Sequence, residues 1–168
     1  DPVTGVVRAS GGRRLGAITL AAAGAGALSD ADIESALIEG VRTHGLDLLP
    51  WPGSALALRQ RAFWAGIESL GDDALLASLD EWLEPLLKGC RRLDAIDPGS
   101  LTDALKNLLG WTERQEIGAR APASFVSPAG SSHPIDYAAP AGPTVELRVQ
   151  ALFGLAEHPV IGVDRVPL

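Results

Sequence analysis

The clearest structural signal in the chain is the run SDADIESALIEGVRTHG at residues 29–45. Ser29 is a good helix N-cap, and Asp32 stands where a capping box needs an acidic side chain. From Ile33 an apolar residue recurs every four positions, as on one face of a helix. Gly45 is suited to end that helix in the left-handed conformation. The run therefore predicts an amphipathic helix with a defined start and stop.

Two further helices are expected directly after it. Apolar spacing predicts a helix over residues 54–70 that buries Leu56, Phe63, Ile67 and Leu70. A second helix is expected over residues 72–83, because leucines and a tryptophan recur there at helical spacing. Pro85 should kink or restart that helix, since proline lacks the backbone N–H that a helix interior needs.

The last helical signals are again caps. Asp97-Pro98 combines an N-cap with a proline at the first helical position, and Gly110 provides the stop. Thr112 is expected to open one more short helix, because Thr112 to Gln115 reads as a capping box. Residues 29–121 are thus predicted to form a helical domain.

Strand signals lie at the two ends of the chain. Residues 3–8 and 13–20 read as two strands of a hairpin, and residues 125–137 read as a second hairpin with its turn at 127–130. Residues 144–153 fit either a strand or a helix, and we favour the helix because Gly154 could end it. Residues 160–168 return to strand character. The predicted fold class is α+β: an N-terminal hairpin at 1–28, a mainly helical middle, and a small strand-rich C-terminal unit at 122–168.

Composition and charge limit the classes of function that the chain can have. The chain has 168 residues, is 46% hydrophobic and carries a formal charge of -7, which counts against strong autonomous binding to nucleic acid. The single Cys90 fits a reducing compartment. The apolar stretch at 15–28 is broken by glycines and is too short for a bilayer, and no signal peptide is evident. A cytoplasmic protein without membrane contact is expected.

No residue pattern indicates catalysis or metal binding. The sequence has no phosphate-binding loop, no Asp-Glu-x-His motif and no nucleophile elbow. His44, His133 and His158 have no partner at a metal-ligand spacing. Ser131 and His133 are near neighbours, but proximity in sequence does not make a triad. We expect no catalytic residue, no metal and no cofactor in this chain, which also lacks methionine and reads as a piece of a longer protein.

Several short motifs, in this order, resemble the HrpB family of bacterial ATP-dependent, DEAH-type RNA helicases. The N-terminal motifs resemble the segment after the family's helicase core, the middle motifs its all-helical insert, and the last motifs its C-terminal region. They are Asp1–Gly5, Arg13–Ala17, Leu49-Pro50-Trp51 with Arg59, Leu79–Leu83, Ser127–Gly130, Ile135-Asp136-Tyr137, Arg148-Val149-Gln150, Phe153-Gly154 and Arg165–Leu168. At 127–130 the sequence Ser-Pro-Ala-Gly stands where the family has a Ser-Gly turn. The resemblance implies a parent protein that hydrolyses ATP with Mg²⁺ and acts on RNA.

The resemblance implies an accessory role for the chain itself, because the motor motifs are missing. DEAH-type relatives carry an oligonucleotide-binding-like barrel beyond the core, so the hairpin at 1–28 is expected to resemble part of such a barrel. The chain would then dock on the helicase core of the same polypeptide and contact single-stranded RNA. The alternative is a protein-interaction module that does not contact nucleic acid.

Two groups of basic side chains are candidates for the RNA contact. Arg8, Arg13 and Arg14 flank the N-terminal hairpin, and the guanidinium fork suits phosphate. Lys88, Arg91 and Arg92 cluster after a helix, where pairing with the more numerous Asp and Glu is the favoured explanation. Arg148 has apolar neighbours in the sequence and is expected to bridge structural elements.

Overall fold

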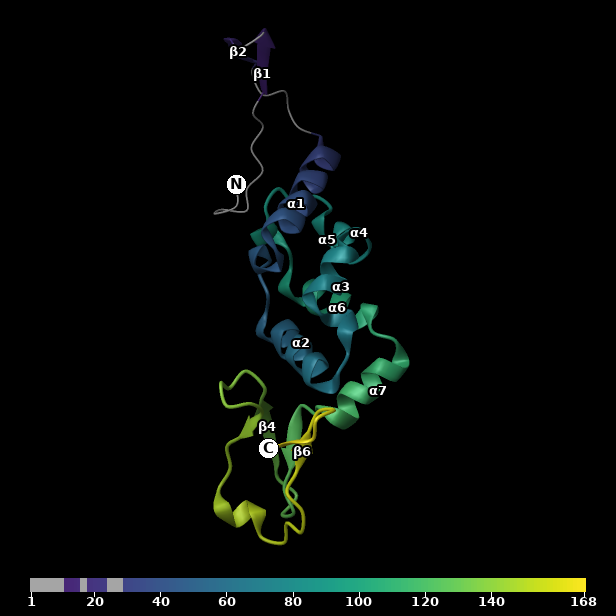
Figure 1. Ribbon diagram of the computed structural model, residues 1–168, viewed down its shortest axis with the longest axis vertical. Coiled ribbons are helices and arrows are strands. Elements are labelled where there is room, and N and C mark those ends of the chain that lie inside the picture. Colours follow the sequence, from purple (N-terminus) through teal and green to yellow (C-terminus); the bar gives the residue numbers. More distant parts are fainter. Residues whose placement is uncertain (1–10, 16–17, 24–28) are drawn as a thin grey trace. The chain divides into compact units, whose positions relative to one another are not determined.

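The computed structural model describes residues 11–15, 18–23 and 29–168 (Figure 1). Helices fill its middle, and small antiparallel sheets follow the last helix. The α+β fold class predicted from the sequence is therefore confirmed. The folded chain divides into two compact units, which we describe separately.

At the N-terminal end, β1 (Gly11–Leu15) pairs with β2 (Ile18–Ala23) as an antiparallel hairpin with a register shift between Arg13 and Arg14. The predicted strand at 3–8 and Arg8 lie outside the described residues. The predicted strand at 13–20 is wrong as a single element, because its two halves belong to different strands of this pair.

The first unit takes the described residues up to Trp51 together with Leu76–Ala104. Its longest helix is α1 (Asp30–His44), followed by the 3₁₀ turn η1 (Leu46–Leu48). The short helices α4 (Leu79–Trp82) and α5 (Glu84–Leu87), the turn η3 (Leu93–Ala95) and the first part of α6 (Pro98–Leu108) complete it.

The ends of α1 confirm the predicted capping. The Ser29 hydroxyl accepts the Asp32 N–H at 3.2 Å, and the Asp32 carboxylate accepts the Ser29 N–H at 3.2 Å. The hydrogen bond from the Ser29 hydroxyl lowers the pKa of Asp32. Gly45 does end the helix with a φ of 93°, but its ψ of 171° is extended rather than left-handed helical.

The other caps are confirmed in part. Asp97 accepts the Ser100 N–H at 2.8 Å at the start of α6, and this bond lowers the pKa of Asp97. α7 begins at Trp111, so the residue before it, Gly110, is the N-cap in place of Thr112. Gly110 donates its N–H to the Glu113 carboxylate at 2.8 Å, which gives the glutamate half of a capping box without a hydroxyl.

Aliphatic side chains form the core of the first unit. The indoles of Trp51 and Trp82 stack with ring centroids 6.1 Å apart, and Trp51 Nε1 donates to the Leu46 carbonyl at 2.8 Å. This explains how Pro50-Trp51-Pro52, extended by its prolines, still packs a large ring inward. The buried apolar residues of this unit are Ile33, Leu37, Ile38, Val41, Leu46, Leu49, Leu79, Trp82, Leu83, Leu87, Leu93, Ile96 and Leu101.

The second unit contains Pro52–Leu75 and Leu105–Leu168. It is built on α2 (Gly53–Ala65), the turn η2 (Glu68–Leu70), α3 (Asp72–Ala77) and α7 (Trp111–Arg120), with the strands that follow. The chain passes from one unit to the other after Trp51, within α3 and within α6.

The predicted helix over 54–70 is too long, because α2 ends at Ala65. Its predicted buried face is confirmed at Ile67 and Leu70, which follow α2, and is wrong at Leu56 and Phe63. Gly66, in the left-handed conformation (φ 75°, ψ 28°), ends α2 by donating its N–H to the Phe63 carbonyl at 3.0 Å. Phe63 is 75% exposed and Leu56 41% exposed, whereas the alanines of α2 are buried. The helix therefore packs closely through its small residues and leaves its largest side chains outside. The buried alanines are Ala55, Ala62 and Ala65.

The strands after α7 form two small sheets. The hairpin predicted at 125–137 is confirmed as β3 (Ser124–Val126) and β4 (Ser132–Asp136). β5 (Thr144–Val145) pairs with β4, and the turn η4 (Val149–Leu152) follows. β6 (Val160–Ile161) and β7 (Val166–Pro167) form a separate antiparallel pair.

One prediction for this region is wrong and one is confirmed. The favoured helix over 144–153 is replaced by β5 and η4, because Val145 pairs with Ile135 of the central strand. The strand character predicted for residues 160–168 is confirmed by the β6–β7 hairpin. Its turn includes Gly162 with a φ of 77° and Arg165 with a φ of 52°.

Candidate nucleic-acid interface and exposed surfaces

The arginines of the second unit mainly hold backbone carbonyls. Arg61, on α2, donates its Nε to the Ala121 carbonyl at 2.6 Å, and Tyr137 donates its hydroxyl to the next carbonyl, that of Pro122, at 2.7 Å. Burial lowers the pKa of Arg61 and raises the pKa of Tyr137 to about 12. These two bonds join α2, the end of α7 and the end of β4.

A parallel set of contacts joins the last hairpin to α2. Arg120 donates to the Ala65 carbonyl at 3.1 Å, and the Gly162 N–H donates to the Arg120 carbonyl at 2.7 Å. The Val163 N–H donates to the Trp64 carbonyl at 3.2 Å. Since all three bonds involve backbone groups that would otherwise be unpaired at element ends, these contacts are structural.

Arg59 and Arg114 also donate hydrogen bonds to carbonyls at the ends of helical segments. Arg114 donates to the Leu109 and Lys106 carbonyls at 3.1 and 2.6 Å, beyond the last turn of α6. Arg59 donates to the Leu70 carbonyl at 3.2 Å and pairs with Asp72. It lines an open cleft of about 910 Å³ in which Asp72 and Asp73 place negative charge. A cleft lined this way does not suit an RNA backbone.

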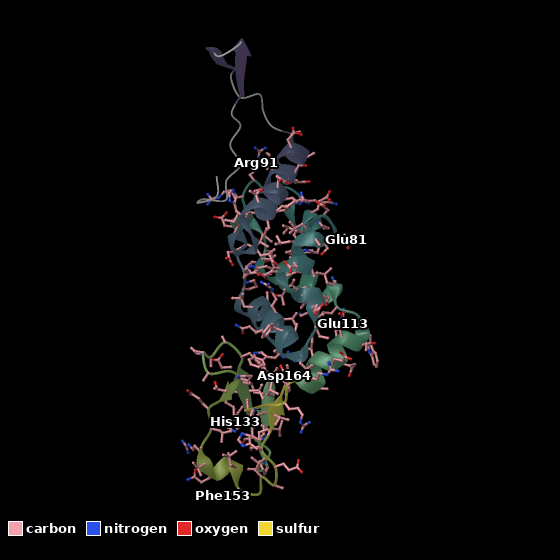
Figure 2. All side chains as sticks on the ribbon, viewed as in Figure 1. Glu81, Arg91, Glu113, His133, Phe153 and Asp164 are labelled. Atoms are coloured by element: carbon pink, nitrogen blue, oxygen red, sulfur yellow. The ribbon has the colours of Figure 1, made fainter. Side chains whose placement is uncertain are left out.

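The predicted cluster at 88–92 is largely engaged with carboxylates. Arg92 donates to both carboxylate oxygens of Asp94, at 2.9 and 2.5 Å, and Arg91 (labelled in Figure 2) lies 3.5 Å from a carboxylate oxygen of Asp30. These pairs favour the explanation that pairing, not phosphate binding, accounts for the arginines. Lys88 is exposed. Arg13 and Arg14 lie on β1.

His133 takes part in a local hydrogen-bond network. The hydroxyl of Ser131 lies 2.8 Å from His133 Nε2 and 2.7 Å from the Ser127 hydroxyl, and the Ser127 N–H donates to the Ser131 carbonyl at 2.8 Å. Together these bonds close the turn between β3 and β4. Within the side chains that the structure describes, no three His, Cys, Asp or Glu residues gather as metal ligands.

Exposed apolar side chains are the surface feature that the sequence prediction missed. Residues 149–155, which we call the 149–155 patch, present Val149 at 70%, Phe153 at 70%, Leu152 at 37% and Leu155 at 36% exposure. Figure 2 shows Phe153 at the end of the second unit that lies far from α2. The motif Arg148-Val149-Gln150 with Phe153-Gly154 marked this segment, but the favoured helix over 144–153 gave no indication that its apolar residues are exposed.

The expectation for Arg148 stays a prediction. Its side chain is exposed just before η4, at the edge of the patch. As to membranes, no helix among the described residues has both the length and the apolar character needed to span a bilayer.

Comparison with known proteins agrees with this architecture of a helical middle followed by small sheets. Two crystal structures superpose on the chain: an Escherichia coli DEAH/RHA helicase HrpB, with a TM-score of 0.69 and 30% identity over 94% of this chain and 21% of that one, and an E. coli DExH-box NTPase HrpB, with a TM-score of 0.70 and 31% identity over 89% and 19%. The fold is thus one found in part of a DEAH/RHA-type helicase. Residues 82–168 match the sequence model of the family described as "ATP-dependent helicase C-terminal".

The particular family is HrpB, and the chain belongs to it as the C-terminal helicase-associated domain. The ATP-dependent RNA helicase HrpB of E. coli K12 is 30% identical over 175 aligned residues, which cover 100% of this chain and 22% of that protein. The chain therefore spans about a fifth of the length of the relative that it matches. The family resemblance inferred from the short motifs is confirmed.

Proposed function

We propose that this chain is an accessory domain that docks on the ATPase motor of an HrpB-like polypeptide and helps that motor engage single-stranded RNA. The carrying observation is the match to HrpB over the full length of the chain, in which the chain corresponds to only 22% of the relative. On this proposal the whole polypeptide acts in the cytoplasm and hydrolyses ATP with Mg²⁺ in its other part.

The contacts of the basic side chains count against RNA binding by the two folded units. Arg61, Arg114 and Arg120 hold carbonyls, while Arg91 and Arg92 face carboxylates. A binding strip for RNA needs cations that can exchange their counterions for phosphate. We therefore assign the RNA contact to the N-terminal hairpin, through Arg8, Arg13 and Arg14.

Binding of labelled single-stranded RNA to the 168-residue chain tests the RNA contact. At low salt we expect saturable binding that weakens steeply as salt rises, and a loss of most affinity in the Arg13→Glu/Arg14→Glu variant. Arg91→Glu/Arg92→Glu is the matched control, because it reverses the same charge in a cluster already paired with carboxylates. Equal losses in both variants would reject the hairpin as the site.

The docking role has its own test. We expect the full-length gene product lacking this domain to show a lower RNA-stimulated ATPase rate, and expect the same product with Arg13→Glu/Arg14→Glu to lose RNA stimulation while keeping its basal rate. Absence of any RNA binding at low salt, with an ATPase defect on deletion, would favour the alternative of a protein-interaction module. An unchanged ATPase rate on deletion would reject the accessory role.

A further inference from the structure

The 149–155 patch presents apolar side chains from a hydrogen-bonded turn. The Ala151 N–H donates to the Arg148 carbonyl at 2.8 Å, and the Leu155 N–H donates to the Leu152 carbonyl at 3.0 Å. A Cβ on Gly154 would lie 3.7 Å from Cβ of Pro128, so the segment rests against the turn between β3 and β4. The exposure of Val149 and Phe153 is therefore fixed by local hydrogen bonds.

The chemistry of the patch favours protein over nucleic acid. Residues 149–155 read VQALFGL and contain no charged side chain. An aromatic ring that stacks on bases normally works beside cations that hold the backbone. Arg148 precedes the segment and Glu157 follows it, so the flanking residues in the sequence add no net positive charge. The occupant expected from this composition is an apolar protein surface.

The size of the patch indicates which protein surface that is. At the exposed fractions given above, these side chains with Pro128 offer on the order of 400 Å² of apolar surface, in the range of patches that mark interaction sites. A stable dimer of separate chains needs roughly 800 Å² per partner. A covalently attached partner needs less, because its effective concentration is in the range of about 1 mM.

We propose that the 149–155 patch, with Phe153 as its anchor, is the face by which this domain docks on the remainder of its own HrpB-like polypeptide. This inference rests on the proposed accessory function and assigns that docking to one surface. The E. coli relative indicates the size of the partner: about four-fifths of its length lies outside the region that this chain matches. The corresponding part of this chain's own polypeptide is the proposed partner. An aromatic side chain at the centre of a small apolar face is the usual form of an interface hot spot.

Thiol labelling provides the test. In a Cys90→Ser background, Val149→Cys and Trp111→Cys place one thiol each at positions that are 70% and 76% exposed. We expect the Val149→Cys thiol to react with a maleimide about tenfold more slowly in the full-length gene product than in the 168-residue chain, as for a segment that is protected most of the time. The Trp111→Cys thiol should react at the same rate in both. Adding Phe153→Ser to the full-length Val149→Cys protein should restore fast labelling, whereas adding Val126→Ser should not.

Each other outcome counts against the inference in a distinct way. If Phe63→Cys or Trp111→Cys becomes protected in the full-length protein and Val149→Cys does not, docking occurs through another face. If none of the three is protected, docking itself fails, and the proposed function fails with it. Protection that grows with concentration in the 168-residue chain would indicate a second copy, and protection that requires added single-stranded RNA would indicate nucleic acid; both overturn the proposal.

Discussion

Replacing Gly162 by alanine should destabilise the second unit far more than the addition of one methyl group suggests. Gly162 has a φ of 77°, and a Cβ built on it would lie 2.6 Å from the Trp64 carbonyl oxygen and 3.4 Å from the carbonyl carbon. The opposing atoms are backbone atoms of α2, so they cannot rotate away as a side chain would. The Gly162 N–H also donates to the Arg120 carbonyl at 2.7 Å, so a shift that relieves the clash strains this bond.

The magnitude follows from two separate costs. A left-handed backbone costs an L-residue about 1–2 kcal/mol, and overpacking adds about 1–3 kcal/mol. Gly130→Ala is the matched control, because Gly130 has a φ of 83° and a Cβ there would meet nothing within 4 Å. We expect a loss of about 1 kcal/mol for Gly130→Ala and about 3 kcal/mol for Gly162→Ala.

Thermal unfolding of the two variants, followed by far-UV circular dichroism, measures the difference. A loss of about 3 kcal/mol corresponds to a fall in Tm of roughly 6–12 °C for a chain of this size, against about 2–4 °C for the control. Equal shifts for Gly162→Ala and Gly130→Ala would show that the close approach of the last hairpin to α2 does not exist.

Four further substitutions test the packing. Tyr137→Phe should cost about 1 kcal/mol by removing the hydrogen bond to the Pro122 carbonyl. Because burial raises the pKa of Tyr137 to about 12 from 10.0, its contribution is full below pH 10 and is lost as pH rises through 12; urea titrations across this range should show that alkaline loss in the wild type and not in the variant. Leu79→Ala, at a fully buried position, should cost about 3 kcal/mol, whereas Leu56→Ala, at 41% exposure, should cost less than about 1 kcal/mol in the same titration. Ser29→Ala should lower the free energy of unfolding by about 1 kcal/mol through loss of the α1 cap. The Gly45 amide, which donates to the Val41 carbonyl at the other end of α1, should stay as protected from hydrogen exchange as in the wild type.

Sequence signals that act locally gave the parts of the fold that proved right. Ser29 with Asp32, and Asp97 with Ser100, place a side-chain oxygen within three residues of the N–H that it accepts. Such geometry depends on nearby residues alone, so spacing is enough to predict it. Gly66 was the local signal that the prediction overlooked.

Packing against distant elements could not be predicted in the same way. On α2 the expected rule was that large apolar residues face inward, but the alanine face lies inside and Phe63 lies outside. Val145 had two satisfactory periodicities, and only its pairing with Ile135 selected the strand. The burial or secondary structure of these residues is decided by partners that lie far away in the sequence.

The candidate RNA residues show the same limit. The pairing of Arg92 with Asp94 follows from adjacency, but Arg91 meets Asp30 on a helix 61 positions earlier in the numbering. Exposure of Phe153 was equally invisible, because an apolar residue beside a glycine reads as a helix end as readily as a surface turn. Arg13 and Arg14 stay a prediction for the assay described above.

The hydrogen bonds from the last hairpin to α2 show that the segment matched by the family model differs from the segment that packs together in the second unit. The family match begins at Trp82, whereas the carbonyls of Trp64 and Ala65, which accept from Val163 and Arg120, lie upstream of it. A fragment cut at that boundary would keep the whole segment that the family model matches and lose the helix against which its final strands pack. The segment that the family model covers is thus smaller than the segment whose residues form the contacts between the last hairpin and α2.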